Sequence, residues 1–297
     1  MTSATRALLP GFEERFADLA GVLLRYFVAG EGEPLVLVHG LGGGASNWVE
    51  LAPALARRRR VLVPDLPGHG GSAPLPAAPN VAAYADRAAL LIEREAMLPA
   101  AVVGHSFGGL VGLLLAVRRP ETVSALVLAA AAGISTRRPF TRFAIRFVGR
   151  TRPGRLVLPL RGVIARVPWL RYPVFGWWGV ADPPALSARA VEGFLAPQAL
   201  HTDVASAGSA LLAEEPGAEL GGVRCPCLVL WGARDAMVPL RDGFEYARRL
   251  GAPLRVIADC GHLLIGERPA ECLDAIEIFL DRVRQVDELP LEPEPLG

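Results

Sequence analysis

The sequence contains no lysine, so all 31 of its Lys and Arg positions are arginine. A chain without lysine cannot form a Schiff base through a side-chain amine or use a lysine as a nucleophile or base. A phosphate-binding P-loop is excluded as well, because its G-K-[ST] ending needs the lysine. Chemistry that depends on a side-chain amine is therefore ruled out.

Strong net charge and long apolar segments are also lacking. The formal net charge of the 297-residue chain is +1, so we expect no general attraction to nucleic acid. No uninterrupted apolar run is long enough to span a membrane. Residues 1–11 lack the apolar core and cleavage site of a secretory signal. These absences predict a cytoplasmic protein with a small-molecule substrate.

Cysteine is scarce, with only four residues in the chain. Cys225 and Cys227 are too closely spaced for an ordinary zinc knuckle, and no histidine pair accompanies them. Free, mostly buried thiols are typical of a reducing compartment. We expect neither a disulfide framework nor a bound metal.

Short apolar runs alternate with longer helical patterns along most of the chain. Fully apolar runs of this length are typical of strands buried on both faces of a parallel sheet. The predicted strands are 22–28, 35–38, 61–63, 101–103, 123–128, 227–231 and 254–257. The predicted helices are 81–95, 110–118, 243–250 and 269–283. This alternation predicts an α/β fold with a doubly wound, mostly parallel sheet.

One segment interrupts the alternation. Residues 135–213 contain no strand-like run followed by a turn, but they hold arginines, prolines, aromatics and short helical patterns. We predict a helical cap at 135–213, inserted into a core formed by 1–134 and 214–286. Residues 287–297 are acidic and proline-rich, which predicts a disordered tail.

The run Gly104-His105-Ser106-Phe107-Gly108 fits G-x-S-x-G between a predicted strand and a predicted helix. In that context the serine occupies a sharp, strained turn that projects its hydroxyl, and larger residues in place of the glycines would collide. We predict that Ser106 is a nucleophile. The alternative is a glycine-rich helix start in which the serine only caps the helix.

A serine hydroxyl needs a base and an orienting acid. Of five histidines, His262 follows the last predicted strand on the sheet edge where Ser106 also lies, so position favours it. His39 and His69 lie in turns where imidazoles often hold loops together, and His105 points away from its neighbour. Asp235 follows the strand 227–231 on the same edge and is the predicted acid. Alternatives remain: His262 could only stabilise its loop, Asp235 could cap a turn, and Asp259 is a weaker rival acid.

A glycine-rich loop, His39 to Gly44, follows the strand 35–38. Glycine lets the backbone approach a ligand closely. We predict that the N–H groups of Leu41 and Phe107 form an oxyanion hole. We assign four further residues to substrate binding: Gly40, His105, Trp177 and Trp178.

These motifs resemble those of the α/β-hydrolase superfamily over Phe12 to about Val283: H-G-L-G-G-G, D-L-P-G-H-G-G-S, G-H-S-F-G-G, W-G-A-R-D and G-H-L-L-I-G-E-R-P. The order Ser106, Asp235, His262 is the chain order of that superfamily's triad. The resemblance implies a helical cap and no metal or organic cofactor. Haloalkane dehalogenases and epoxide hydrolases of this fold have aspartate where Ser106 stands, so both become disfavoured. The loop H-G-L-G is more similar to the esterase, lipase and carbon–carbon hydrolase branches than to the branch with H-G-G-G.

The predicted function is hydrolysis of carboxylic esters with an apolar acyl or aryl group. The alternatives are a carbon–carbon bond hydrolase of ring-cleavage products, acyl transfer or perhydrolysis on the same triad, and a slow-turnover ligand-binding receptor. A carboxylate-binding arginine in the pocket would favour the carbon–carbon hydrolase.

The predicted cap is rich in arginine and poor in acids, which are Asp182, Glu192 and Asp203. Two interpretations remain open. Either the arginines are simply solvated while an apolar face packs on the pocket, or a basic, aromatic surface meets anionic lipid or an anionic substrate.

Overall fold

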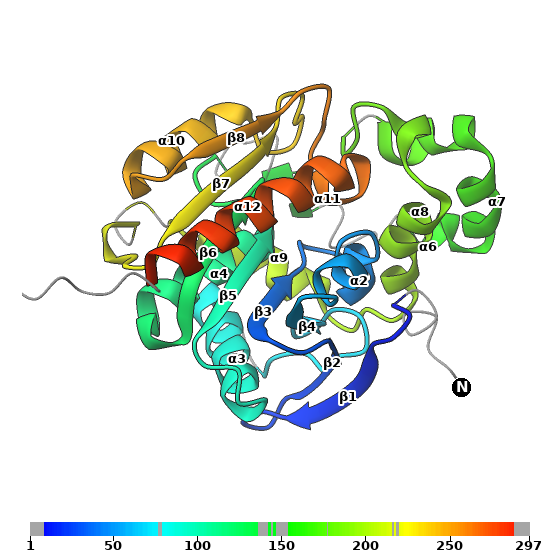
Figure 1. The fold of residues 1–297 in the computed structure, drawn as a ribbon. Helices are drawn as coiled ribbons and strands as arrows, with labels where there is room; N and C mark the ends of the chain where they lie inside the picture. Colours follow the sequence, from blue (N-terminus) through cyan, green and yellow to red (C-terminus); the bar gives the residue numbers. More distant parts are fainter. Residues whose placement is uncertain are drawn as a thin grey trace, which may run out of the picture.

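The computed structural model describes residues 9–76, 79–135, 142–143, 145–146, 154–176, 178–215, 217 and 220–287. An eight-stranded sheet in the order β1-β2-β4-β3-β5-β6-β7-β8 forms its centre (Figure 1). The strands from β4 to β8 in this order are parallel, whereas β1 and β2 run antiparallel at one edge. The bounds are β1 (Glu13–Asp18), β2 (Leu23–Ala29), β3 (Glu33–Val38), β4 (Arg59–Pro64), β5 (Ala100–His105), β6 (Val123–Ala129), β7 (Cys227–Gly232) and β8 (Leu254–Ile257).

The predicted fold class is confirmed, and each predicted strand has its counterpart. Every residue of β5 and β7 is buried, as expected for strands covered on both faces. The sequence analysis missed β1. In this edge strand only Ala17 is buried, so the segment carries no apolar run that would indicate a strand.

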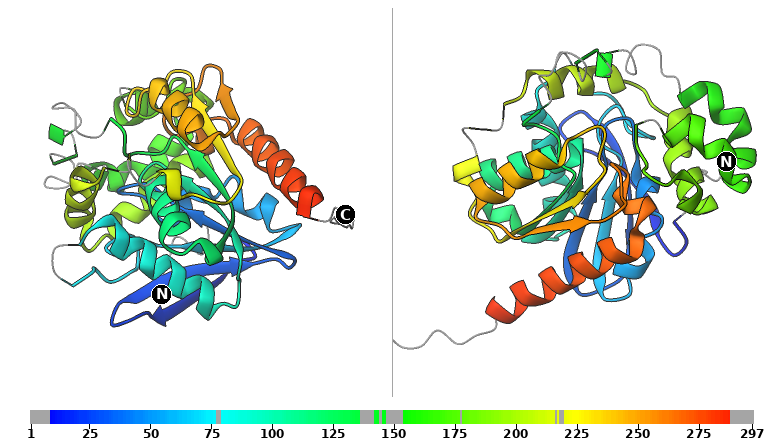
Figure 2. Two further views of the ribbon diagram at one scale, coloured as in Figure 1. Left: turned by 90° about the vertical axis from the view of Figure 1, so that its left-hand side faces the viewer. Right: turned by 90° about the horizontal axis from the view of Figure 1, so that it is seen from above.

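Helices cover both faces of the sheet. In Figure 2, α3, α4 and α10 lie on one face, and α2 and α12 lie on the other. The bounds are α2 (Ala52–Leu55), α3 (Val81–Arg94), α4 (Phe107–Arg118), α10 (Leu240–Leu250), α11 (Leu264–Glu267) and α12 (Pro269–Asp287). Asn80 caps α3 by accepting from the N–H of Ala83, and the left-handed Gly251 ends α10.

Helix α12 continues four residues beyond Val283, where the sequence analysis placed its end. No glycine or proline interrupts 284–287, so the helical hydrogen bonds continue as far as Asp287. The prediction of a disordered tail from 287 is therefore wrong at its first residue. Residues 288–297 lie outside the described part of the chain.

Between β6 and β7 the described residues form short helical segments and no strand. We call residues 135–213 the insertion. Its described elements are α6 (Gly154–Val157), η3 (Leu158–Leu160), α7 (Arg161–Arg166), η4 (Pro168–Arg171), η5 (Tyr172–Gly176), η6 (Pro183–Ala185), α8 (Ala188–Leu195), η7 (Ala196–Ala199) and α9 (Val204–Ala213). Figure 1 shows α6 and α8 on the side of the molecule that holds α2 and α11, and α7, which packs against α8, lies farther out. Among the described helices, none has the length and apolar character needed to cross a bilayer.

Candidate active site

Ser106 lies on the sharp turn between β5 and α4. Its backbone angles are φ 54° and ψ −115°, a conformation that non-glycine residues rarely adopt. The turn is fixed by β6, because the Ser106 N–H donates to the carbonyl of Ala129 at 2.9 Å and the Ser106 carbonyl accepts from Ala132 at 3.0 Å. These hydrogen bonds therefore stabilise the strained backbone conformation of Ser106.

The two glycines of G-x-S-x-G are required by close packing. A Cβ on Gly104 would lie 2.3 Å from the carbonyl oxygen of Gly108, and a Cβ on Gly108 would lie 2.2 Å from that of Val38. Neither position can accept a side chain without moving main-chain atoms. The sequence argument for glycine at both positions agrees with this geometry.

The structure brings Ser106, His262 and Asp235 together, although 156 residues separate the first two. The Nε2 atom of His262 lies 3.0 Å from Ser106 Oγ, and its Nδ1 atom lies 2.8 Å from Asp235 Oδ2. The other oxygen of Asp235 accepts from the N–H groups of Met237 and Val238, both at 2.8 Å. This arrangement can move a proton from a hydroxyl to an imidazole whose charge a buried carboxylate stabilises.

Asp259, the rival acid, takes no part in this arrangement. Its exposed carboxylate lies 3.7 Å from a guanidinium nitrogen of Arg234. The acid bonded to His262 is therefore Asp235.

The glycine-rich loop after β3 lies next to the nucleophile. A Cβ on Gly40 would be 3.1 Å from the Cβ of Ser106. Within the described part of the chain, neither the N–H of Leu41 nor that of Phe107 donates a hydrogen bond to another protein group. Phe107 is the first residue of α4, so its N–H also lies at the positive end of the helix dipole. Two unused donors next to Ser106 are what an oxyanion hole needs.

The insertion holds this loop from the other side. The carbonyl oxygen of Gly42 accepts hydrogen bonds from Gln198 Nε2 at 2.7 Å and from His201 Nε2 at 2.9 Å. The ring of His201 also accepts from the N–H of Gly70 through Nδ1. Burial lowers the pKa of His201 to about 3, so its ring is neutral and can both donate and accept. No role was predicted for His201.

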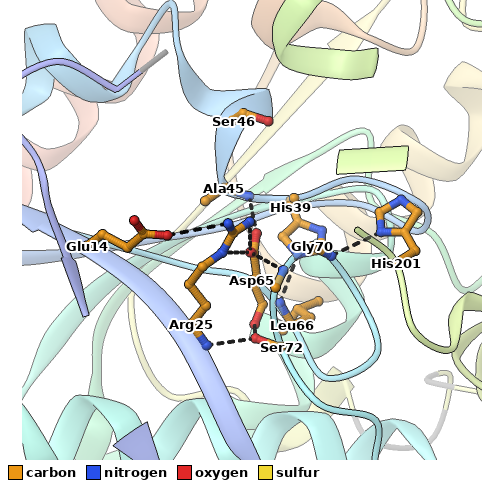
Figure 3. A network of polar contacts seen from close by, with 12 residues as sticks. Glu14, Arg25, His39, Ala45, Ser46, Asp65, Leu66, Gly70, Ser72 and His201 are labelled. Carbon is orange, nitrogen blue, oxygen red and sulfur yellow. Dashed lines mark hydrogen bonds and ion pairs between the residues drawn. The ribbon is translucent and has the colours of Figure 1, made fainter. Parts of the chain in front are cut away.

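Below the loop lies a buried charge pair (Figure 3). Asp65 Oδ2 accepts from Arg25 Nε at 2.6 Å, and its Oδ1 accepts from the N–H of Ala45 at 2.7 Å. Ser72 Oγ donates to the Asp65 carbonyl and accepts from the N–H of Arg25. The motif D-L-P-G-H-G-G-S marks Asp65 and Ser72 in the sequence, whereas nothing in the sequence points to Arg25.

His39 and His69 hold loops, as expected. His39 donates from Nδ1 to the Gly40 carbonyl at 2.8 Å and accepts at Nε2 from the N–H of Leu66 at 2.9 Å. His69 donates from Nδ1 to the Pro67 carbonyl at 3.0 Å. Burial lowers the pKa of both rings, and each therefore serves as a neutral hydrogen-bonding group.

His105 does not lie where a substrate-binding residue was expected. Its side chain is buried, and its Nε2 atom donates to the carbonyl oxygen of His262 at 2.8 Å. Burial lowers the pKa of His105 to about 3, so the ring is neutral. These contacts give His105 a position that supports the main chain of His262.

Glu267 connects the insertion to the loop of His262, a link that the sequence analysis missed. Its buried carboxylate accepts from the N–H groups of Ala181 and Asp182 through Oε1 and from Gly261 through Oε2, at 2.7 to 2.9 Å. The N–H of Leu263 adds a bond to the Gly179 carbonyl at 2.7 Å. The sequence shows a glutamate in G-H-L-L-I-G-E-R-P, but it does not indicate its partners in the insertion, 85 and 86 positions away.

Trp178 is half-buried and donates from Nε1 to the carbonyl of Val174 at 2.8 Å. It lines a cavity of about 150 Å³ between the insertion and the Asp235 loop. The other lining residues are Gly176, Val180, Ala181, Arg234 and Ala236. Trp177 lies outside the described residues. Within the part of the chain that is described, no group of three or more His, Cys, Asp or Glu side chains is arranged to hold a metal ion.

Comparison with known proteins agrees with this geometry. The model of the alpha/beta hydrolase family matches residues 35–275. A dihydrolipoyllysine-residue acetyltransferase component of the acetoin cleaving system of Pseudomonas putida is 32% identical, over 89% of this chain and 68% of that protein. A 2-hydroxymuconate semialdehyde hydrolase of Pseudomonas sp. (strain CF600) is 31% identical, over 88% of this chain and 91% of that protein.

Among solved structures, a membrane phospholipase A, a bacterial virulence factor, is similar with a TM-score of 0.72 and 28% identity. The match covers 94% of this chain and 89% of that one. The family match spans most of the chain, and it includes Ser106, Asp235 and His262. The chain therefore belongs to the alpha/beta hydrolase family.

Proposed function

We propose that the protein is a serine hydrolase that cleaves carboxylic esters with an apolar acyl or aryl group. The observation that carries this proposal is the hydrogen-bonded series Ser106–His262–Asp235 beside two unused backbone N–H groups. The series supplies a nucleophile with its base, and the amides supply donors for a developing oxyanion. The likeness to a phospholipase A, an enzyme named for ester cleavage, supports the ester as the substrate bond.

The mechanism follows from the positions of these atoms. Ser106 Oγ attacks the ester carbonyl carbon while His262 Nε2 takes the hydroxyl proton, and Asp235 stabilises the imidazolium. The N–H groups of Leu41 and Phe107 donate to the oxyanion. His262 then gives the proton to the leaving alkoxide, and an acyl-enzyme remains. Water, deprotonated by the same imidazole, attacks the acyl-enzyme and releases the acid and the free serine.

We further propose that the insertion, 135–213, is the cap over this site. Trp178 and Val180 line the cavity beside the Asp235 loop, and Glu267 fixes 181–182 to the loop of His262. The choice of an apolar acyl or aryl group rests on the side chains of Trp178 and Val180 in this lining, which also includes Arg234. The chemistry uses only side chains and backbone amides of this chain, so the proposal includes no metal or organic cofactor.

A second candidate is hydrolysis of a carbon–carbon bond in a ring-cleavage product. It is supported by the 31% identity to the semialdehyde hydrolase and by Arg234, a residue of the cavity lining whose guanidinium would have to leave Asp259 to bind a substrate carboxylate. The same three residues would serve both reactions.

The test is turnover of p-nitrophenyl esters of increasing acyl length by the wild type and by Ser106→Ala. We expect a maximum at one acyl length and no turnover above background by the variant. Folded wild-type protein that cleaves none of these esters would contradict the ester proposal. Turnover of a carboxylated dienone by that protein would then establish the second candidate.

A further inference from the structure

An apolar stripe lies on the outside of the insertion. Residues 154–166 form one continuous helical run through α6, η3 and α7. Leu156, Leu160 and Val163 are spaced i, i+4 and i+7 on this run and are 80%, 56% and 46% exposed. A stripe at this spacing normally faces a core. Here it faces outward.

The exposed stripe is not needed to attach this helical run to the rest of the protein. Ile164 and Ala165, on the other side of α7, are buried where α7 packs against α8. The run is therefore already anchored through its inner side. Leucine and valine on the outer side contribute nothing to that packing, so their exposure calls for a separate explanation.

Two amphipathic aromatics continue the apolar surface. Trp169 on η4 and Tyr172 at the start of η5 are 68% and 54% exposed. Tryptophan and tyrosine are the residues enriched where protein meets the membrane–water interface, because one part of each ring system is apolar and another is polar. We call Leu156, Leu160, Val163, Trp169 and Tyr172 the outer face.

The segment that carries the outer face is rigidly held. Arg171 is buried between Trp169 and Tyr172, and its guanidinium donates to the carbonyls of Ala165 at 2.6 Å and Pro184 at 2.9 Å. It also donates to the carbonyl of Leu186. These bonds fix η4 to α7 and to the segment before α8. The outer face is thus presented in one conformation, which lowers the entropy cost of binding.

Between 154 and 172 every charged side chain is basic. Arg155, Arg161 and Arg166 are exposed on the same helical run. From 135 to 181 the sequence holds ten arginines and not one aspartate or glutamate, so the remainder of the chain carries an excess of acidic residues. Within the described residues, exposed positive charge therefore lies on the same run as the exposed Leu156, Leu160 and Val163.

We propose that the outer face docks onto the surface of a membrane that contains anionic lipid. Exposed leucine and valine enter the headgroup region, Trp169 and Tyr172 lie at its boundary, and the arginines bind lipid phosphates. Charge repulsion argues against a second copy of this chain as the partner, because a symmetric contact would bring two arginine-rich faces together. The aliphatic stripe argues against nucleic acid as the partner. Its phosphates would bind the arginines but would make no contact suited to the leucine and valine side chains.

The test is co-sedimentation of the full chain with vesicles of phosphatidylcholine alone or with 30% phosphatidylglycerol. We expect binding to the anionic vesicles that weakens at high salt, and at least tenfold weaker binding to phosphatidylcholine. Fluorescence gives a second readout. In a Trp177→Phe, Trp178→Phe background, anionic vesicles should shift the tryptophan emission to the blue, and Trp169→Phe should remove the shift, since the remaining Trp48 and Trp231 are fully buried.

Matched variants locate the surface. Leu156→Ser, Leu160→Ser and Val163→Ser combined should weaken binding at least tenfold, whereas Phe16→Ser, Phe244→Ser and Ile278→Ser combined, equally exposed residues of other elements, should not. Arg161→Gln with Arg166→Gln should also weaken binding, and Arg224→Gln with Arg255→Gln should not.

Three results would overturn the proposal. They are no binding to anionic vesicles, equal losses in the test and control variants, or a vesicle-free dimer that the serine variants convert to monomer. If the serine variants fail to fold, the emission shift and its loss in Trp169→Phe still decide the matter. None of these measurements requires turnover, so their outcome is independent of the proposed ester hydrolysis.

Discussion

His105 and His262 are joined by a hydrogen bond from the Nε2 of the first to the carbonyl oxygen of the second, at 2.8 Å. The residue that precedes the proposed nucleophile therefore holds the main chain of the proposed base. A side chain that only filled space at this position would leave the spacing between Ser106 and His262 less well fixed.

We predict that His105→Phe lowers kcat about fivefold, because a buried neutral hydrogen bond contributes about 1 kcal/mol and a tenfold change in rate corresponds to about 1.4 kcal/mol. His105→Gln, which can place an amide N–H near Nε2, should keep kcat within about threefold. KM should change little in both, because the His105 ring is buried and bonded to the main chain of His262. Steady-state kinetics with one ester measures kcat and KM of both variants. Equal losses of kcat in the two variants would contradict the role of the hydrogen bond.

Asp235→Asn should lower kcat by roughly 10³ to 10⁴ while leaving the fold intact. One oxygen of Asp235 accepts from Met237 and Val238, so an asparagine at this position must keep its carbonyl there. Its amide nitrogen then faces His262 Nδ1 and forces the imidazole into the tautomer with the proton on Nε2. A ring in that tautomer cannot accept the proton of Ser106.

Thermal unfolding of Asp235→Asn supplies the control. A midpoint close to that of the wild type, together with the loss of kcat, is expected. Activity within tenfold of the wild type would mean that the carboxylate charge contributes little to catalysis.

Stability should fall as the pH drops below about 6.5. The folded-state pKa of His201 is lowered from 6.5 to about 3, and so is that of His105. The unfolded chain therefore binds protons first, and each ring removes roughly 1.4 kcal/mol per pH unit between about pH 6.5 and pH 3. Above pH 6.5 these rings leave the free energy of unfolding unchanged. Urea unfolding at intervals between pH 8 and pH 5 measures this slope.

The variant His201→Gln removes one of the titrating rings. It should be less stable at pH 8, because the bonds to Gly42 and Gly70 are altered, but its stability should depend less steeply on pH. The same slope in both proteins would show that His201 does not contribute to the acid sensitivity.

Glu267→Gln should lower both stability and kcat. The carboxylate accepts three backbone N–H groups, and a glutamine must turn an amide N–H toward at least one of them. An unsatisfied buried group costs about 1 to 3 kcal/mol. Glu271→Gln, a change on the exposed side of α12, is the matched control and should change neither quantity. Thermal melts and steady-state kinetics on the two variants give the comparison.

Much of the fold was predictable because its signals are local. Apolar runs predicted every parallel strand, and the G-x-S-x-G pattern predicted the strained turn that the structure places at Ser106. The meeting of Ser106, Asp235 and His262 also followed, since the carboxyl ends of parallel strands share one sheet edge. Edge strand β1 was missed because only Ala17 is buried in it.

The supporting contacts were not predictable, because each joins residues that are distant in sequence and chemically ordinary. Gln198 reaches Gly42 across 156 positions, and Glu267 reaches Ala181 across 86. No pattern in either segment indicates the other. The bond of His105 was not predictable for a related reason, since its partner is a main-chain carbonyl that carries no side-chain signal.

The bonds from Glu267 and Leu263 to residues 179–182 limit how this protein can be recombined with its relatives. An insertion taken from another family member would bring its own counterpart of 179–182, but 261–267 would remain those of the host. The partners in 179–182 are main-chain groups, so a foreign insertion keeps these bonds only where its backbone follows the same path. An insertion with another path at this point should displace the loop of His262 unless 261–267 are exchanged with it.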